Sequence, residues 1–194
     1  MKIIIINGTA CSGKDSFIDC IKSKSYVNSF FIYNYSTIDR IKTIAEQCGW
    51  DGIKDEKGRQ LLSDLKDAFS KYNDLPYKDV IYRINSKINN FNRYKVPTDR
   101  LVFFIHCREP QEIRKFRNSL NAKTLLVRRP SLTEEYHNHA DKFVYNFNYD
   151  YRYVNDKDLF GMQEDAEKFI DNLLEEDWYS FGEDLILPWD ENDN

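Results

Sequence analysis

The stretch that decides the fold is GTACSGKDS, Gly8–Ser16, which directly follows Asn7 and the apolar run KIIII at residues 2–6. The run has no polar alternation, which is typical of a strand buried on both faces of a parallel sheet. Gly8, Gly13 and Lys14 have the spacing of a phosphate-binding loop, and a buried strand before it and a helix after it support that interpretation. The alternative is an ordinary glycine turn with a solvated lysine.

In such a loop, backbone amides and the helix N-terminus bind phosphate oxygens, and Lys14 bridges the β- and γ-phosphates of a nucleotide. The glycines let the backbone turn tightly and approach the ligand closely. The residues predicted to bind phosphate are Gly8, Thr9, Ala10, Cys11, Ser12, Gly13, Lys14, Asp15 and Ser16.

A carboxylate, Asp15, stands where this motif usually has a hydroxyl residue. At the first turn of a helix it can complement the helix dipole, an effect of about 0.3–1 kcal/mol. Beside a triphosphate, however, it would be repelled unless a divalent cation lay between the two charges. We therefore predict that Asp15 positions Mg²⁺, directly or through water, and that Ser16 can share this role.

Composition places the chain among globular proteins. Its 194 residues, 41% of them hydrophobic, predict a single domain over residues 1–194. The net charge of −4, with Lys and Arg scattered, argues against a nucleic-acid tract or a polybasic membrane surface. No apolar run approaches the roughly 20 residues of a membrane helix, and a strand starting almost at Met1 predicts no signal peptide.

The four cysteines predict a reducing environment. Cys11, Cys20, Cys48 and Cys107 form no CxxC pair and no zinc-ligand spacing. We interpret them as reduced thiols of a cytoplasmic protein. Nothing in the pattern separates a monomer from a homodimer.

Apolar periodicity along the chain predicts alternating strands and helices, hence an α/β fold with a mostly parallel sheet flanked by helices in three layers. Residues 128–148 are polar and aperiodic, and residues 175–194 form an acidic tail for which we predict only packing by Trp178 and Trp189. The expected strands are 3–6, 28–36, 101–107, 124–127 and 149–154, and the expected helices are 14–22, 37–48 with Ser36 as N-cap, 54–72, 77–91, 110–120 and 162–174.

The string GKDS, Gly13–Ser16, resembles the phosphate loop of phage-type deoxynucleoside monophosphate kinases and of the related animal phosphomevalonate kinases. These belong to the nucleotide-kinase group of P-loop proteins, which also includes dephospho-coenzyme A kinases. LVFFIHCREPQEIRKF at 101–116 resembles the third core strand and the following helix of the phage-type kinases. The resemblance spans residues 1–174 in scattered motifs, of which the loop is the specific one.

The resemblance implies an acceptor-binding helical region at 37–95, because nucleotide kinases bind the acceptor phosphate after the second strand. Arginine and lysine there can make charge-assisted hydrogen bonds to a monophosphate. The alternative is that they are solvated surface charges. The candidate acceptor-binding residues are Arg40, Lys54, Arg59 and, after the third strand, Arg108.

The resemblance also implies a lid at 128–148, in which Arg128 or Arg129 would stabilise charge on the transferring phosphoryl group. A surface salt bridge is the alternative. His137 and His139 give only two ligands for a metal, so we interpret them as polar lid residues. In these kinases the turn before the last helix lies beside adenine, which makes Asn155 and Asp156 candidates for that contact.

One departure from the wider P-loop pattern concerns the metal. No aspartate closes the strand at 101–107 as a Walker B residue would, and Glu109 can take that place through water. A capping and packing turn is the alternative for Glu109. The missing aspartate makes Asp15 more important for the metal.

The function predicted from these motifs is ATP- and Mg²⁺-dependent phosphoryl transfer to a small phosphorylated acceptor, with a (deoxy)nucleoside monophosphate as the expected acceptor. Positioning and electrostatics carry such a reaction, so no covalent nucleophile is required. One alternative is an acceptor such as dephospho-coenzyme A or another phosphorylated metabolite. The other is a nucleotide-binding regulator that hydrolyses ATP slowly.

Overall fold

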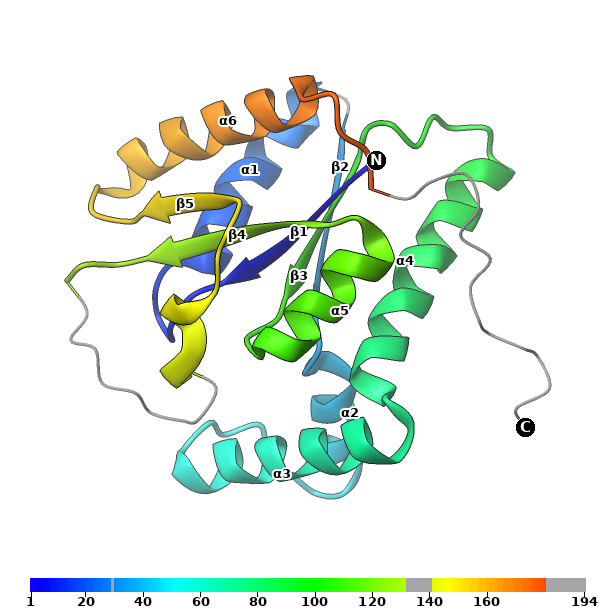
Figure 1. The fold of residues 1–194 in the computed structure, drawn as a ribbon, viewed down its shortest axis with the longest axis vertical. Helices are drawn as coiled ribbons and strands as arrows, with labels where there is room; N and C mark the ends of the chain where they lie inside the picture. The colour runs from blue at the N-terminus through cyan, green and yellow to red at the C-terminus, as the bar shows by residue number, and fades with distance from the viewer. Residues whose placement is uncertain (29, 132–140, 181–194) are drawn as a thin grey trace.

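The computed structural model describes residues 1–28, 30–131 and 141–180 (Figure 1). Its centre is a five-stranded sheet in the order β2-β3-β1-β4-β5, in which every neighbouring pair is parallel. The prediction of a mostly parallel sheet is confirmed. The strands are β1 (Lys2–Asn7), β2 (Phe31–Ser36), β3 (Leu101–His106), β4 (Lys123–Arg128) and β5 (Tyr151–Val154).

Helices connect the strands, as the alternating pattern predicts. The first helix extends beyond the predicted end at residue 22, to Asn28. The helices are α1 (Lys14–Asn28), α2 (Asp39–Gln47), α3 (Glu56–Asn73), α4 (Leu75–Arg93), α5 (Pro110–Leu120) and α6 (Leu159–Glu175), with a 3₁₀-helix η1 (Asp141–Asn146).

The predicted N-cap of α2 is wrong. Ser36 is the last residue of β2 and pairs with His106, so it is held in the sheet. The helix begins at Asp39 with Ile38 at the N-cap, where no side chain caps it. The Asp39 carboxylate instead accepts a hydrogen bond from the Ser36 amide at 2.9 Å, which ties the strand end to the helix start.

The sheet lies between two helical layers, which confirms the three-layer prediction (Figure 1). Ile4 and Ile6 of β1 pack in the cluster that holds residues of α1 and α6. Ile3 and Ile5 point to the opposite face, in the cluster with residues of α4, α5 and η1. All four isoleucines are fully buried, which explains why the run shows no polar alternation.

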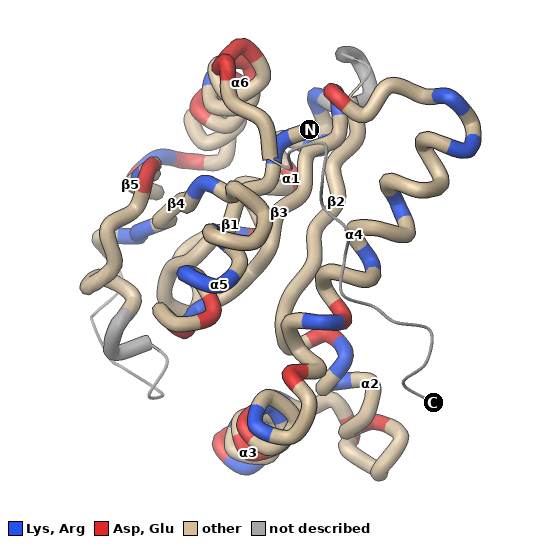
Figure 2. The backbone as a smooth tube through the Cα atoms, turned by 45° about the vertical axis from the view of Figure 1, so that its right-hand side comes forward, with Lys and Arg blue, Asp and Glu red and all other residues tan. Residues whose placement is uncertain are grey.

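Helices α2 and α3 follow the carboxyl end of β2 and form a separate small core. Ile41 and Ala45 of α2 pack with Leu62 of α3. Acidic and basic residues are interleaved along the described chain, and α3 carries both signs (Figure 2). In the part of the chain that the structure describes, no helix combines the length and apolarity required to cross a membrane.

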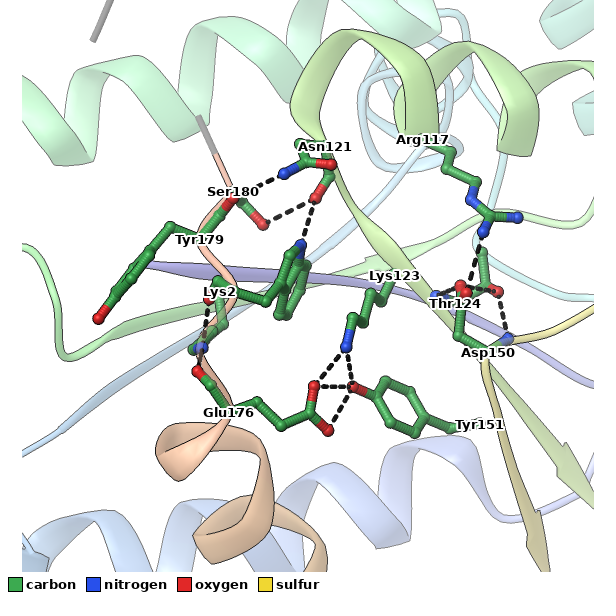
Figure 3. A network of polar contacts seen from close by, with 11 residues as sticks. Lys2, Arg117, Asn121, Lys123, Thr124, Asp150, Tyr151, Glu176, Tyr179 and Ser180 are labelled. Atoms are coloured by element: carbon green, nitrogen blue, oxygen red, sulfur yellow. Dashed lines mark hydrogen bonds and ion pairs between the residues drawn. The ribbon is translucent and has the colours of Figure 1, made fainter. Parts of the chain in front are cut away.

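The segment that follows α6 lies at the amino-terminal ends of the strands, where β1 starts (Figure 3). The buried Lys2 ammonium donates to the carbonyls of Glu176 and Trp178. The Glu176 carboxylate accepts from Lys123 and from the Tyr151 hydroxyl. The Ser180 hydroxyl accepts from the Ile3 amide at 2.9 Å, so residues 176–180 are fastened across the start of the sheet.

Candidate active site

The carboxyl ends of all five parallel strands meet at one edge of the sheet. In open α/β sheets, ligands bind in the crevice outside these ends. The loop predicted to bind phosphate follows β1, at the centre of the strand order. His106 ends β3, Arg128 ends β4, and Asn155 follows β5.

The backbone of the loop requires both of its glycines. Gly8 has φ +152° and Gly13 has φ +97°, values that side-chain-bearing residues rarely adopt. A Cβ at Gly8 would lie 2.3 Å from the Val127 carbonyl oxygen, and one at Gly13 would lie 2.3 Å from Asn155 Nδ2. The spacing read from the sequence therefore corresponds to a loop packed against β4 and the end of β5.

Buried polar side chains hold the base of the loop, and no local sequence pattern pointed to them. Asn7 Oδ1 accepts from the Gly8 amide at 2.8 Å, and Asn7 Nδ2 donates to the Tyr149 hydroxyl at 2.7 Å. That hydroxyl donates to the Val144 carbonyl of η1 at 2.7 Å. Burial raises the pKa of Tyr149 to about 12, so it stays a neutral donor.

Asn155 supports the other end of the loop. Its side chain is buried, and Nδ2 donates to the Ser12 carbonyl oxygen at 3.0 Å. Its amide donates to the Arg128 carbonyl at 2.7 Å, at the end of β4. The contact with adenine predicted for Asn155 remains a prediction, while the contact with Ser12 gives this residue a clear role in loop geometry. Its neighbour Asp156 is exposed.

Lys14 lies across the mouth of the loop. Its ammonium donates to the carbonyl oxygens of Gly8 at 2.8 Å and Thr9 at 2.7 Å. A cavity of about 430 Å³ adjoins it, lined by loop residues 11–16 and also by Arg129, Asn155, Lys157 and Leu159. The structure thus brings most of the predicted phosphate-binding residues to one cavity, and adds Lys157 and Leu159, which the sequence did not single out.

The two arginines at the end of β4 are placed differently. Arg129 lines the cavity beside the loop, and its Nε donates to the Ser131 hydroxyl at 3.2 Å. The Arg128 guanidinium lies 5.7 Å from the centroid of the Tyr145 ring in η1. Of the pair predicted to meet the transferring phosphoryl group, Arg129 is the one beside the loop. His137 and His139 lie outside the described residues.

His106 occupies the strand end where the sequence lacks a Walker B carboxylate. Its side chain is 16% exposed, and Nε2 lies 3.5 Å from Asp15 Oδ1, whose side chain is 82% exposed. Burial lowers the pKa of His106 to about 4, an effect that the nearby Asp15 carboxylate only partly offsets. The imidazole is therefore neutral at neutral pH, and its contact with Asp15 is not an ion pair. Sequence reasoning missed this residue.

The turn after β3 holds Arg108 and Glu109. The Arg108 carbonyl accepts from Asn7 Nδ2 at 3.4 Å, so this turn contacts the residue before the loop. Glu109 is the N-cap of α5, but its side chain makes no capping hydrogen bond there. Within the described residues no hydrogen bond or ion pair joins its carboxylate to the loop. Its role as a metal ligand remains a prediction.

In the helical region predicted to bind the acceptor, the charged residues that make side-chain contacts differ from those predicted. Arg40, Lys54 and Arg59 are all exposed. Arg83 of α4, which the sequence did not single out, pairs with Asp39 at 3.0 Å, and its guanidinium lies 4.1 Å from the centroid of the Tyr35 ring. Asp39 could have been singled out from the sequence. It comes three residues after the end of a predicted strand, and ligands bind outside the carboxyl ends of parallel strands.

A second cavity, of about 500 Å³, lies along β2 and α4. Tyr33, Tyr35 and Arg83 line it, together with Lys22 of α1 and Lys87 of α4. It shares no lining residue with the cavity at the loop. Within the described residues, no group of three or more His, Cys, Asp or Glu is arranged to hold a metal ion.

The parallel sheet, the glycine-dependent loop and the helix that follows it define a P-loop α/β protein. No family model matches the chain, and no curated protein matches it. Among solved structures, shikimate kinase from Aquifex aeolicus is similar, with a TM-score of 0.47 and 12% identity over 88% of this chain and 97% of that one.

Proposed function

We propose that this protein is a P-loop kinase that transfers the γ-phosphoryl group of ATP to a small phosphorylated acceptor. The expected acceptor is a (deoxy)nucleoside monophosphate. The observation that carries the proposal is the cavity that joins loop residues 11–16 to Arg129. A loop built to bind phosphate and an arginine beside it are two of the parts that phosphoryl transfer requires.

The roles of the residues follow from charge and position. Loop amides and Lys14 bind the donor phosphates, and Lys14 exchanges its bonds to the Gly8 and Thr9 carbonyls for phosphate oxygens. Arg129 stabilises the charge that spreads over the oxygens of the transferring phosphoryl group. In such reactions this lowers the activation free energy by roughly 3 kcal/mol or more. Asn155, Lys157, Asp158 and Leu159 line the same cavity, which supports the proposal that the base binds against this segment.

A divalent cation accompanies ATP in this chemistry, and the residues present fit one. Asp15 and Ser16 are exposed oxygen donors that line the same cavity as Lys14. Oxygen donors are the ligands that Mg²⁺ takes in proteins. When bound, the ion neutralises phosphate charge. Asp15 and Ser16 would hold it, while the surrounding residues orient the donor.

The acceptor is proposed to bind between the loop and α2–α4. Asp39 and Arg108 lie near His106 on that side, and Arg83 pairs with Asp39. Arginine recognises phosphate through paired hydrogen bonds. Arg40, Lys54 and Arg59 remain candidates if the helices move toward the ligand.

The experiment measures ADP release from ATP and Mg²⁺ with and without a panel of nucleoside and deoxynucleoside monophosphates, with dephospho-coenzyme A included. We expect at least about tenfold faster release with the true acceptor. In Lys14→Ala this release should fall by at least about a hundredfold while the circular dichroism spectrum is unchanged. Lys168→Ala, at an exposed lysine of α6 that lines neither cavity, is the control variant and should keep activity.

Three results would contradict the proposal. Release that no acceptor accelerates would favour a slow ATPase of regulatory function. Full activity in Lys14→Ala would remove the loop from the reaction. Failure of ATP to bind at all would reject the P-loop kinase as a whole.

A further inference from the structure

The largely buried imidazole of His106 is a group to which the proposed function gives no task. It ends β3 between two partners, pairing with Ile6 of β1 and Ser36 of β2, so the sheet fixes its backbone on both sides. Its Nε2 atom is fully buried and has no hydrogen-bond partner within the described residues. Buried polar atoms are almost always partnered, so an unpartnered one requires an explanation such as a ligand.

The neighbouring Asp15 carboxylate suggests such a ligand, a divalent cation. Asp15 Oδ1 lies 3.5 Å from Nε2, and the Asp15 side chain is 82% exposed and can adjust its position. Two adjacent ligands of an octahedral ion with bonds of about 2.1 Å are separated by about 3 Å. A shift of roughly half an ångström in Asp15 would therefore let one ion bind both atoms.

We propose that His106 and Asp15 together ligate the nucleotide-bound divalent cation, and that this nitrogen–oxygen pair gives the site a preference for first-row transition ions over Mg²⁺. The inference rests on the proposed function, because the nucleotide phosphates supply the remaining oxygen ligands. Magnesium takes oxygen ligands, whereas imidazole suits transition ions, whose affinity for such sites rises from Mn²⁺ through Co²⁺ to Cu²⁺.

The surrounding charges restrict when the ion binds. Lys14 and Arg108 are positive and lie near His106, while Asp15 and Asp39 are negative. These charges balance, so the protein alone offers a cation little net attraction. The polyphosphate of the nucleotide tips the balance, and the ion should bind as a nucleotide complex and only weakly without it.

The first test compares Co²⁺ with Mg²⁺, which have similar size but different affinity for imidazole. Binding of each ion, with a non-hydrolysable ATP analogue present, is measured by calorimetry for the wild type and for His106→Gln. Glutamine can place an amide oxygen near the position of Nε2, so the variant has an all-oxygen site. We expect the Co²⁺-to-Mg²⁺ affinity ratio to fall by at least about tenfold in the variant. An unchanged ratio would overturn the proposal.

The second test needs no change at the buried position. A His137→Ala/His139→Ala variant leaves His106 as the sole histidine of the sequence, and the protein is prepared with ¹⁵N-histidine. Pulsed electron paramagnetic resonance of bound Mn²⁺ with the ATP analogue should then show coupling to a ¹⁵N nucleus. Absence of that coupling, with Mn²⁺ bound, would exclude His106 as a ligand.

These experiments can reject the P-loop kinase and the histidine ligand separately. If the ATP analogue does not bind with any divalent ion, the P-loop kinase itself is rejected. If the analogue binds with Mg²⁺, but the affinity ratio is insensitive to His106 and no nitrogen coupling is seen, only the histidine ligand is rejected. Binding of Co²⁺ without nucleotide, as tight as with it, would contradict the charge argument.

Discussion

At the scale of single residues, Cys11 offers a direct report on the loop. It is exposed and has φ +57°, within the segment proposed to surround the phosphates. We expect ATP with Mg²⁺ to slow alkylation of Cys11 by iodoacetamide by about tenfold or more, because a bound polyphosphate and its ion exclude the reagent and make the loop rigid. Mass spectrometry of the alkylated peptide measures the rate.

The other cysteines are internal controls for this experiment. Cys48 is exposed after α2, so its alkylation should be unaffected by nucleotide. Cys107 should be unreactive throughout, because burial raises the pKa of its thiol well above the usual value. Equal slowing of Cys11 and Cys48 would indicate a general effect of nucleotide on the protein, and no slowing of Cys11 would contradict binding at the loop.

Residue roles were predictable only where they depend on local spacing. Gly8, Gly13 and Lys14 belong to one motif, which lies within the seven consecutive residues 8–14. The supports of the loop pair residues far apart in sequence: the residue numbers of Asn7 and Tyr149 differ by 142, and those of Ser12 and Asn155 by 143. A single sequence contains no signal for such pairs, which exist only because parallel strands bring their ends together.

At the scale of elements, apolar periodicity located the helices and strands because burial imposes it. Strand β3, LVFFIH, has five fully buried residues in a row and was predicted within one residue of its end. Ser36 shows the limit: serine is a good N-cap in isolation, but its pairing with His106 keeps it in β2. Tertiary pairing decided the boundary against local preference.

Acid sensitivity should arise in the segment after α6. Burial alone would raise the pKa of Glu176, but hydrogen bonds from Lys123 and Tyr151 outweigh it and lower the pKa below its ordinary value of 4.5. A lowered pKa in the folded state means that the ionised carboxylate contributes stability above pH 4.5, and that this contribution is lost as the pH falls further. Glu176→Gln should therefore be less stable than the wild type at neutral pH.

Urea unfolding at about pH 7 and about pH 3 tests this expectation. The difference in free energy of unfolding between Glu176→Gln and the wild type should shrink at the lower pH. Glu175→Gln is the matched control, because Glu175 is the exposed neighbour at the end of α6. A difference that persists unchanged in acid would show that packing, and not the charge of Glu176, accounts for it.

At the scale of the whole molecule, the fold class followed from the alternation of strands and helices, but the strand order did not. Placing β3 between β1 and β2 depends on which faces and edges fit in three dimensions. That placement is what brings His106 beside the loop, so the strand order also explains why the sequence missed this residue. The helical region 37–95 was predicted, and its Asp39–Arg83 pair was not.

Because the loop joins the central strand, nucleotide binding should stabilise the entire fold. A ligand at 100 times its Kd stabilises the state that binds it by about 2.7 kcal/mol. ATP with Mg²⁺ should therefore raise the thermal midpoint by several degrees, roughly 4 °C or more. Lys14→Ala should show little of this increase while its midpoint without nucleotide stays near the wild-type value. A rise of equal size in both proteins would contradict binding through the loop.

The open edge of β2 has a consequence for solubility. An unpaired edge strand is a template on which another chain can add a strand, the first step of aggregation. Here Lys22, Arg83 and Lys87 line the groove beside that edge, and Lys87 and Arg83 lie over the rings of Tyr33 and Tyr35. A second copy approaching this edge would bring its own three positive charges against them, so within the described residues these side chains protect β2 against strand addition.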